Sequence, residues 1–104
     1  MAATFRPGNY LYRTSAVVTA YPFTISCWVW KPAADLATDR AFVSIGDPTG
    51  ASSDWTLGCT GAVPVFRSGI RDATAAKGMR GNRWHHICGV GRSATSRDAY
   101  LDGG

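Results

Sequence analysis

Apolar and polar residues alternate most clearly between Phe23 and Trp30. The apolar positions are Phe23, Ile25, Cys27 and Val29, and the intervening positions are Thr24, Ser26, Trp28 and Trp30. Because successive side chains of a β-strand point to opposite faces, the first set is predicted to face the core. The second set ends in two indoles, so its face is predicted to be partly covered or to form a binding surface. Pro32 ends the strand.

Seven further short apolar runs, each bounded by turn residues, predict additional strands. They are residues 2–5, 10–13, 41–46, 55–59, 63–67, 84–90 and 97–101. Pro7-Gly8 suits a type II turn, and Asp47-Pro48-Thr49-Gly50 suits a type I turn. Residues 60–62 are predicted to join two strands as a hairpin. Pro64 predicts that residues 63–67 form an edge strand or carry a bulge, because proline has no amide hydrogen for the ladder.

Helical periodicity is weak throughout the chain. No window sustains it beyond about 10 residues, and residues 32–40 are predicted to form one turn at most. Residues 68–82 are rich in Gly, Ala and Arg and are predicted to be a long connection with one short strand at its start. About eight short strands with turn chemistry between them predict an all-β fold, an antiparallel two-sheet sandwich or jelly roll. The 104 residues fit a single domain.

The end of the sequence carries a strong hairpin signal. Asp102-Gly103 follows the apolar run 97–101, and Asp-Gly is a preferred dipeptide of two-residue hairpin turns. A hairpin without its second strand leaves unpaired backbone groups along the first, and proteins seldom leave such an edge bare. We therefore expect a strand from another chain to pair there. The contact residues expected are Arg97, Ala99, Tyr100, Leu101 and Asp102. The alternative, that the 104 residues are a piece of a longer polypeptide, stays open.

Charge and composition narrow the classes of function. The net charge is +4, but the basic residues are scattered along the sequence, so nucleic-acid binding is not expected. No run approaches the ~18 apolar residues of a membrane span, and no secretory signal follows Met1, so synthesis in the cytoplasm without a signal peptide is expected. Cys27, Cys59 and Cys88 form no CxxC pair; free buried thiols are expected, and a disulfide between two of them stays open.

Catalytic residues are hard to find. Glycoside hydrolysis needs two carboxyl groups that reach one bond, and the chain has no Glu. Its seven Asp lie in predicted turns or beside Arg, and the closest pair, Asp98 and Asp102, is explained by cap and turn roles. His85 and His86 are adjacent on a predicted strand, so they point to opposite faces and cannot chelate one ion. The sequence therefore does not predict an enzyme.

Two kinds of ligand remain open. Calcium takes several oxygen ligands from loops, and the candidates for it are Asp47, Asp54, Asp98 and Asp102. Sugars stack on exposed aromatic rings, and the candidates for such a platform are Tyr10, Tyr12, Trp28, Trp30 and Trp55. The alternative for these rings is that they fill the space between the sheets or cover a subunit contact. No other cofactor is expected.

Several segments, in order, resemble the laminin G-like, concanavalin A-like jelly-roll family. They are residues 23–32, 42–46, 84–90 and 99–103. The variant with Trp84-His85-His86 and with Tyr-Leu-Asp-Gly-Gly at 100–104 looks like modules encoded by tailed bacteriophages. The resemblance implies a two-sheet antiparallel sandwich over 1–104 and a role in adhesion, glycan binding or virion surfaces. Family members usually continue past the Asp-Gly turn, so the chain resembles the front part of such a domain, lacking the C-terminal strands.

Two functions are predicted on this basis. The first is a non-catalytic structural or interaction module of a bacteriophage virion, in capsid decoration or on a tail or fibre surface. It would act through contacts with other virion proteins or with its own copies as a homo-oligomer. The second is a carbohydrate-binding adhesion module that recognises glycans on the host surface. Exposure of Trp28 and Trp30 would favour the second, whereas silence across a glycan array together with burial of both would remove it.

Overall fold

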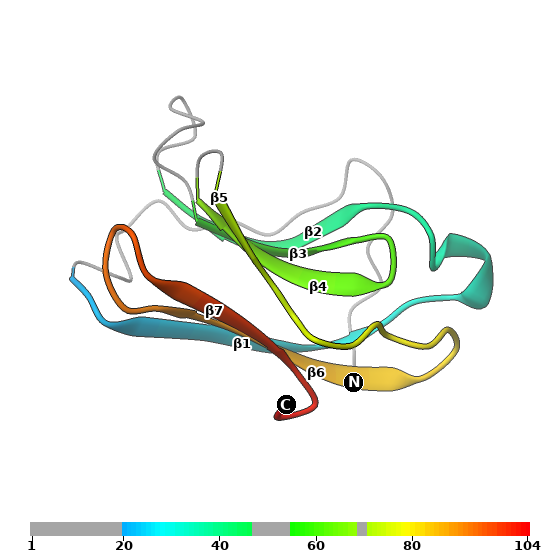
Figure 1. The fold of residues 1–104 in the computed structure, drawn as a ribbon. Helices are drawn as coiled ribbons and strands as arrows, with labels where there is room; N and C mark the ends of the chain where they lie inside the picture. Colours follow the sequence, from blue (N-terminus) through cyan, green and yellow to red (C-terminus); the bar gives the residue numbers. More distant parts are fainter. Residues whose placement is uncertain (1–19, 47–54, 69–70) are drawn as a thin grey trace.

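The computed structural model describes residues 20–46, 55–68 and 71–104, and Figure 1 shows their fold. The elements are β1 (Phe23–Trp30), a 3-10 turn (Ala33–Asp35), β2 (Arg40–Ile45), β3 (Trp55–Thr60), β4 (Val63–Ser68), β5 (Arg71–Thr74), β6 (Trp84–Gly91) and β7 (Arg97–Leu101). The predicted strands at 2–5 and 10–13 and the turns at Pro7-Gly8 and 47–50 lie outside the described residues.

The strands form two antiparallel sheets that pack face to face (Figure 1). One sheet has the order β1-β6-β7, and the other has the order β2-β3-β4-β5. Every pairing is antiparallel. The prediction of an all-β, two-sheet antiparallel sandwich is confirmed. The single turn predicted within 32–40 and the short strand predicted after residue 68 are also present, as the 3-10 turn and β5.

The core lies between the two sheets. Phe66 and Leu57 of one sheet and Ile87 of the other are fully buried there. Gly89 of β6 lies directly over Phe66, and a Cβ atom at this glycine would stand 2.5 Å from Cγ of the phenylalanine ring. Real Cβ atoms do not approach so closely, so the absence of a side chain at Gly89 is what allows Phe66 to reach the opposite sheet.

Lys31 ties the end of β1 to the opposite sheet. Its side chain is buried, with 4% of the residue surface exposed. The ammonium group donates to the carbonyl oxygens of Thr38 at 2.7 Å and of Leu36 and Gly61 at 3.3 Å, and it lies 3.3 Å from Sγ of Cys59. A buried charge needs such partners, and these carbonyls supply them. Lys31 therefore links the end of β1 to the segment just before β2 and to the turn between β3 and β4.

The prediction for Pro64 is wrong. Strand β4 lies between β3 and β5, and its pairing with β3 has no bulge. The Pro64 carbonyl accepts from the amide of Ala75 at 2.9 Å, on the side away from β3. In an antiparallel ladder the nitrogen of the same residue faces the same side. The amide hydrogen that Pro64 lacks would therefore point past Thr74, the last residue of β5. The hydrogen bonds between β4 and β3 are unaffected.

The three cysteines are free thiols. Cys59 is buried, as expected, whereas Cys27 and Cys88 are only partly buried. Partial burial raises the pKa of the Cys27 and Cys88 thiols above the ordinary value. Cys88 lies on the outer side of β6 rather than in the core. In the part of the chain that the structure describes, no helix is long and apolar enough to cross a membrane.

Candidate binding face

Four aromatic rings lie together on the outer side of the β1-β6-β7 sheet. Trp28 and Trp30 come from β1, and Trp84 and His86 come from β6. The strand register places Trp28 opposite His86 and Trp30 opposite Trp84. The exposed fractions are 65% for Trp28, 45% for Trp30 and 51% for Trp84. We call this two-by-two block of side chains the aromatic face.

Strand alternation explains why these rings point outward. On β1 Val29 points inward, so Trp28 and Trp30 on either side of it point outward and are exposed. On β6 His85 points inward, so Trp84 is exposed and His86 is partly exposed. The rings of Trp28 and His86 lie 5.2 Å apart between centroids, with their planes inclined by 57°. This is the distance range of favourable aromatic pairs. The cross-strand contact therefore holds the two rings in place while leaving most of the Trp28 surface open to solvent.

The side chains around the aromatic face are small or polar. By strand register they are Thr24 and Ser26 on β1, Cys88 and Val90 on β6, and Asp98 and Tyr100 on β7. The Asp98 carboxylate pairs with the guanidinium of Arg92. None of the outward positions of these three strands carries Lys or Arg. The outward positions of these three strands therefore carry aromatic and hydroxyl groups and a single carboxylate, that of Asp98.

The predicted turn after β7 is present. Asp102 and Gly103 both have positive φ angles, 51° and 85°, which is the pattern of a type I′ hairpin turn. Leu101 and Gly104 exchange two backbone hydrogen bonds of 3.1 and 3.0 Å across it. The chain direction has therefore already reversed at Gly104.

Asp102 is fully engaged with the start of β6. Its Oδ2 accepts from Nδ1 of His85 at 2.8 Å, and its Oδ1 accepts from the amide of His86 at 2.9 Å. Nε2 of His85 accepts from the amide of Arg80, which places the ring proton on Nδ1. The hydrogen bond from His85, followed by that from the His86 amide, lowers the pKa of the Asp102 carboxyl. Both ring nitrogens of His85 are therefore engaged in hydrogen bonds that hold the turn, and neither is left to act as a base.

The residues predicted for an interface occupy three different environments. Ala99 and Leu101 are buried in the core, Tyr100 points outward beside β6, and Asp102 lies in the turn. Among the described residues, β7 pairs with β6 on one side only, so it forms an edge of its sheet. The structure thus places Arg97–Leu101 at a sheet edge, while two of the five side chains belong to the core.

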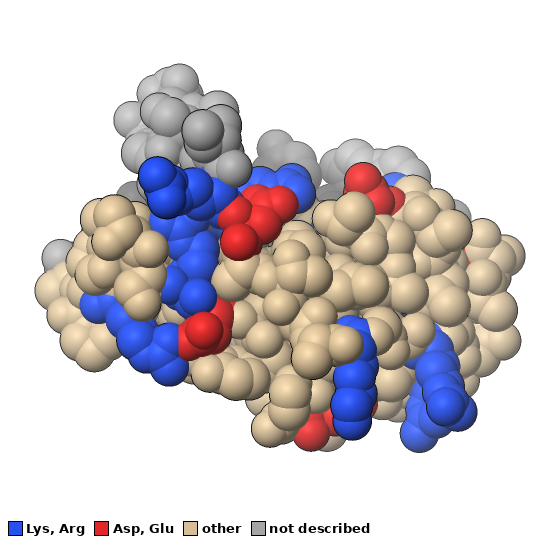
Figure 2. Space-filling view, in the orientation of Figure 1, with Lys and Arg blue, Asp and Glu red and all other residues tan. Residues whose placement is uncertain are grey.

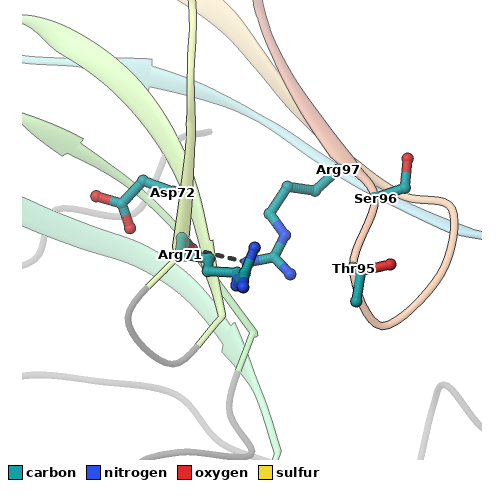
Figure 3. A pocket seen from close by; sticks show the side chains of 5 residues that line it. All are labelled: Arg71, Asp72, Thr95, Ser96 and Arg97. Atoms are coloured by element: carbon teal, nitrogen blue, oxygen red, sulfur yellow. Dashed lines mark hydrogen bonds between the residues drawn. The ribbon is translucent and has the colours of Figure 1, made fainter.

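Arg97 bridges the two sheets near this edge. Its guanidinium lies 4.8 Å above the ring of Trp55 and donates to the carbonyls of Ser68 at 3.2 Å, Arg71 at 2.8 Å and Ala94 at 2.8 Å. Figure 3 shows the Arg97 side chain extending toward the Arg71 backbone. A polar pocket of about 400 Å³ opens here, lined by Arg71, Asp72, Thr95, Ser96 and Arg97. Since Asp72 pairs with Arg67 at 2.7 Å, its carboxylate is already neutralised.

The predicted sugar platform needs one correction. Trp28 and Trp30 lie together and are exposed, but Trp55 is only 8% exposed and packs between the sheets beneath Arg97. Tyr10 and Tyr12 lie outside the described residues. The sequence reasoning missed Trp84 and His86 as members of the face. The alternation in 84–90 already placed them on one side of a strand, but only the register shows that this side adjoins Trp28 and Trp30.

The calcium candidates find other partners. Asp98 pairs with Arg92, and Asp102 is held by His85 and the His86 amide. Asp47 and Asp54 lie outside the described residues. Within residues 20–46, 55–68 and 71–104, no group of three or more His, Cys, Asp or Glu side chains could hold a metal ion. The adjacent histidines do point to opposite faces, as predicted from strand geometry.

Comparison with known proteins places the chain in a family. No curated protein and no solved structure matches the chain significantly. A family model described as the concanavalin A-like lectin/glucanases superfamily matches residues 6–104, nearly the whole sequence. The two antiparallel sheets agree with the sandwich of that superfamily. The chain therefore belongs to the concanavalin A-like lectin/glucanase superfamily.

Proposed function

We propose that this chain is a non-catalytic carbohydrate-binding module that holds its glycan on the aromatic face. The observation that carries the proposal is the joint exposure of Trp28, Trp30 and Trp84 on adjacent strands. Pyranose rings have apolar C–H faces that stack on indoles, while their hydroxyl groups bond to nearby polar side chains. Hydroxyls of Ser26 and Tyr100 lie on the same side of the sheet and can supply such bonds.

The size of the aromatic face supports a ligand of glycan dimensions. The exposed parts of the three indoles offer roughly 240–400 Å² of aromatic surface, since a whole aromatic side chain has about 150–250 Å². Patches of roughly 300–600 Å² on monomers are often functional. A stable protein–protein interface takes about 800 Å² from each partner. The aromatic face is therefore large enough for several sugar units but small for a stable protein interface.

The carboxylates of the described residues support a binding role rather than hydrolysis. Each of them has a partner: Asp35 with Arg40, Asp39 with the Gly61 amide, Asp72 with Arg67, Asp98 with Arg92, and Asp102 with His85. Hydrolysis of a glycosidic bond uses two carboxyl groups facing each other across the substrate. None of these aspartates lies within the aromatic face, and so we assign that face to binding.

The test is a glycan array probed with the wild-type chain and with Trp28→Ala/Trp30→Ala. We expect the wild type to retain a subset of glycans and the double variant to lose them. Arg71→Ala is the matched control, because Arg71 is exposed at the pocket between β5 and β7 and contributes nothing to the aromatic face. Circular dichroism spectra should be unchanged in both variants. Equal glycan binding by the double variant and the wild type would refute the proposal.

A second candidate is an interaction module completed by strand addition at β7. One observation favours it: β7 has one neighbour among the described strands. An added strand would satisfy the backbone groups of Arg97 and Ala99 that face away from β6. We propose a second copy of the chain as the donor. Sedimentation velocity across a wide concentration range should then show a dimer, whereas a monomer throughout would contradict it.

A place on a bacteriophage virion belongs to this second candidate. Its support is the resemblance of Trp84-His85-His86 and the Tyr-Leu-Asp-Gly-Gly end to modules encoded by tailed bacteriophages. On this proposal the chain is synthesised in the host cytoplasm and incorporated into the particle through contacts with other virion proteins. Labelling an intact particle with an antibody raised against the chain tests it. Absence of the chain from purified particles would exclude the virion role without affecting glycan binding.

A further inference from the structure

Lys31 and Cys59 bring an amine and a thiol together inside the sandwich. Figure 2 shows Lys and Arg side chains on the surface of the molecule, several of them beside acidic side chains. Among the residues that the structure describes, Lys31 is the only buried lysine or arginine, with 4% of its surface exposed, and Cys59 is 3% exposed. Nζ of Lys31 lies 3.3 Å from Sγ of Cys59 and donates to it. A nucleophilic nitrogen and an oxidisable sulfur are therefore in contact, out of reach of bulk solvent.

Backbone carbonyls hold the Lys31 amine in this position. The oxygen of Thr38 accepts from Nζ at 2.7 Å, and those of Leu36 and Gly61 accept at 3.3 Å. The Cys59 thiol also points to the Thr38 oxygen, with Sγ 3.8 Å from it. A lysine side chain is usually free to rotate, but this one is fixed with its nitrogen at the separation, about 3–3.5 Å, from which well-oriented groups react. The distance and the confinement together favour a bond between the two atoms once the sulfur becomes electrophilic.

We propose that oxidation by a hydroperoxide, such as hydrogen peroxide, joins Sγ of Cys59 to Nζ of Lys31 in a sulfenamide. In the first step the sulfur attacks a peroxide oxygen, the O–O bond breaks, and the thiol becomes a sulfenic acid with release of water. The sulfur gives up two electrons, and the peroxide takes them. In the second step the Lys31 nitrogen, after loss of a proton to solvent, attacks that sulfur and displaces the hydroxyl group. A second amine proton leaves with the hydroxyl as water, so no further oxidant is needed.

The other two thiols are the competing partners, because a sulfenic acid condenses with a nearby thiol or nitrogen. Cys88 lies on the outer side of β6 and so cannot approach Cys59. Cys27 lies on the inner side of β1 and packs against the core, and its thiol is free. The Lys31 nitrogen is already in contact with the sulfur. We therefore expect the amine, rather than Cys27, to capture the sulfenic acid.

The sulfenamide would tie the two sheets together covalently. Lys31 directly follows β1 in one sheet, and Cys59 belongs to β3 in the other, 28 residues further along the chain. A link over such a span restricts the unfolded chain, as a disulfide does, and so opposes separation of the sheets. Two equivalents of a thiol reductant would break the S–N bond, return the thiol and the amine, and leave as a disulfide. The pair would thus form a reversible redox lock that is independent of glycan binding at the aromatic face.

The experiment uses Cys27→Ser/Cys88→Ser, in which Cys59 is the remaining thiol of the chain. After treatment with hydrogen peroxide, we expect an intact mass lower by two hydrogen atoms and a peptide map in which Lys31 is linked to Cys59. Dithiothreitol should restore the original mass, and the urea midpoint of the oxidised form should exceed that of the reduced form. The same variant with Cys59→Ser added is the matched control and should form no link. Circular dichroism checks both folds, and a peptide map of the oxidised wild type decides the matter if either variant fails to fold.

Three results would overturn the inference. They are a peptide map without a link between Lys31 and Cys59, oxygen added to Cys59 while Lys31 stays unlinked, and a disulfide between Cys59 and Cys27 in the wild type. Peptides that contain Met79 are read separately, because methionine also takes up oxygen. None of these results bears on glycan binding, and silence on the glycan array would leave the sulfenamide standing.

Discussion

Two groups of aromatic side chains lie on opposite sides of one sheet and have opposite environments. Phe23 of β1 packs inward on Trp55 and Phe66 of the other sheet, with ring centroids 5.3 and 6.1 Å away, and we call these three rings the aromatic core. Trp28 and Trp30, also on β1, point outward and remain about half exposed or more. The chemistry of the residues does not separate the two groups. Their parity along the strand does, because a shift of one residue would exchange them.

The difference shows what each group contributes. The rings of the aromatic core contact each other edge to face or at a tilt, and they fill the space between the sheets. Their removal should affect stability. The rings of the aromatic face contact little besides a cross-strand neighbour, so their removal should affect binding and leave the fold intact. Four substitutions test this division between core and surface, and they follow in order of decreasing expected loss of stability.

Phe66→Ala should destabilise the chain most. Phe66 is fully buried and touches both other rings of the aromatic core. Truncating such a side chain removes apolar contacts and leaves a cavity, at a typical cost of about 3–5 kcal/mol. Urea unfolding followed by tryptophan fluorescence measures the change. If Phe66→Ala unfolds at the same urea concentration as Trp28→Ala, the division into core and face is wrong.

Gly89→Ala should have the next largest effect. Its new Cβ atom would lie 2.5 Å from Cγ of Phe66, so the ring or the strand must move. Overpacking of this kind typically costs about 1–3 kcal/mol. Val90→Ala, one residue further on the outer side of β6, is the matched control and should cost less. The same urea titration compares the two, and equal costs would mean that Phe66 can move aside freely.

Asp102→Ala should reduce the sensitivity of the fold to acid. The pKa of Asp102 is lowered in the folded chain by its hydrogen bonds with His85 and the His86 amide. A carboxyl with a lowered pKa stabilises the fold above its unfolded pKa of about 3.9, and this contribution is lost as the pH falls through the lower folded value. Thermal unfolding between about pH 2 and 6 should therefore show a smaller acid-dependent decrease in the variant than in the wild type.

Two features make this acid test specific. Asp35 and Asp72 also have pKa values lowered by their arginine partners, so some acid sensitivity must remain in Asp102→Ala. His85→Gln is the companion variant, because it removes one of the two hydrogen bonds to Asp102 and keeps that of the His86 amide. It should fall between the wild type and Asp102→Ala. An acid profile unchanged in Asp102→Ala would show that the turn contact contributes nothing to folding.

Trp28→Ala should have the smallest effect on stability. The ring is 65% exposed, and its cross-strand partner is His86. Such pairs contribute about 0.2–1 kcal/mol, so the urea midpoint should change little. A loss of stability as large as that of Phe66→Ala would mean that the aromatic face is covered by part of the folded chain. That result would remove it as a binding surface.

Much of the fold was accessible from local patterns in the sequence. The alternation in Phe23–Trp30 correctly divided inner from outer positions, and Asp102-Gly103 correctly placed a hairpin turn. The prediction for Pro64 was wrong because a missing amide hydrogen weakens a sheet only where a carbonyl of the neighbouring strand lies opposite the proline nitrogen. That depends on where β5 ends, which the sequence around Pro64 does not encode.

The aromatic face was only half predictable. Trp28 and Trp30 share a parity that is visible in the sequence, but Trp84 and His86 join them through the register of strands about 55 residues apart. Trp55 was misplaced for the same reason, since its burial depends on Phe23 and Arg97 from the opposite sheet. Local periodicity shows which residues share one face of a strand. It does not show which face is buried when both faces carry aromatic residues.

The buried amine of Lys31 gives the molecule a built-in chemical reporter. The chain has two lysines, and Lys77 is exposed, whereas the Lys31 amine donates to carbonyl groups of the loop before β2 and of the turn between β3 and β4. An acylating reagent should modify Lys77 within the folded chain and reach Lys31 only when the sheets separate. The ratio of modification at the two side chains, read by mass spectrometry, would therefore follow transient opening of the sandwich without any change to the sequence.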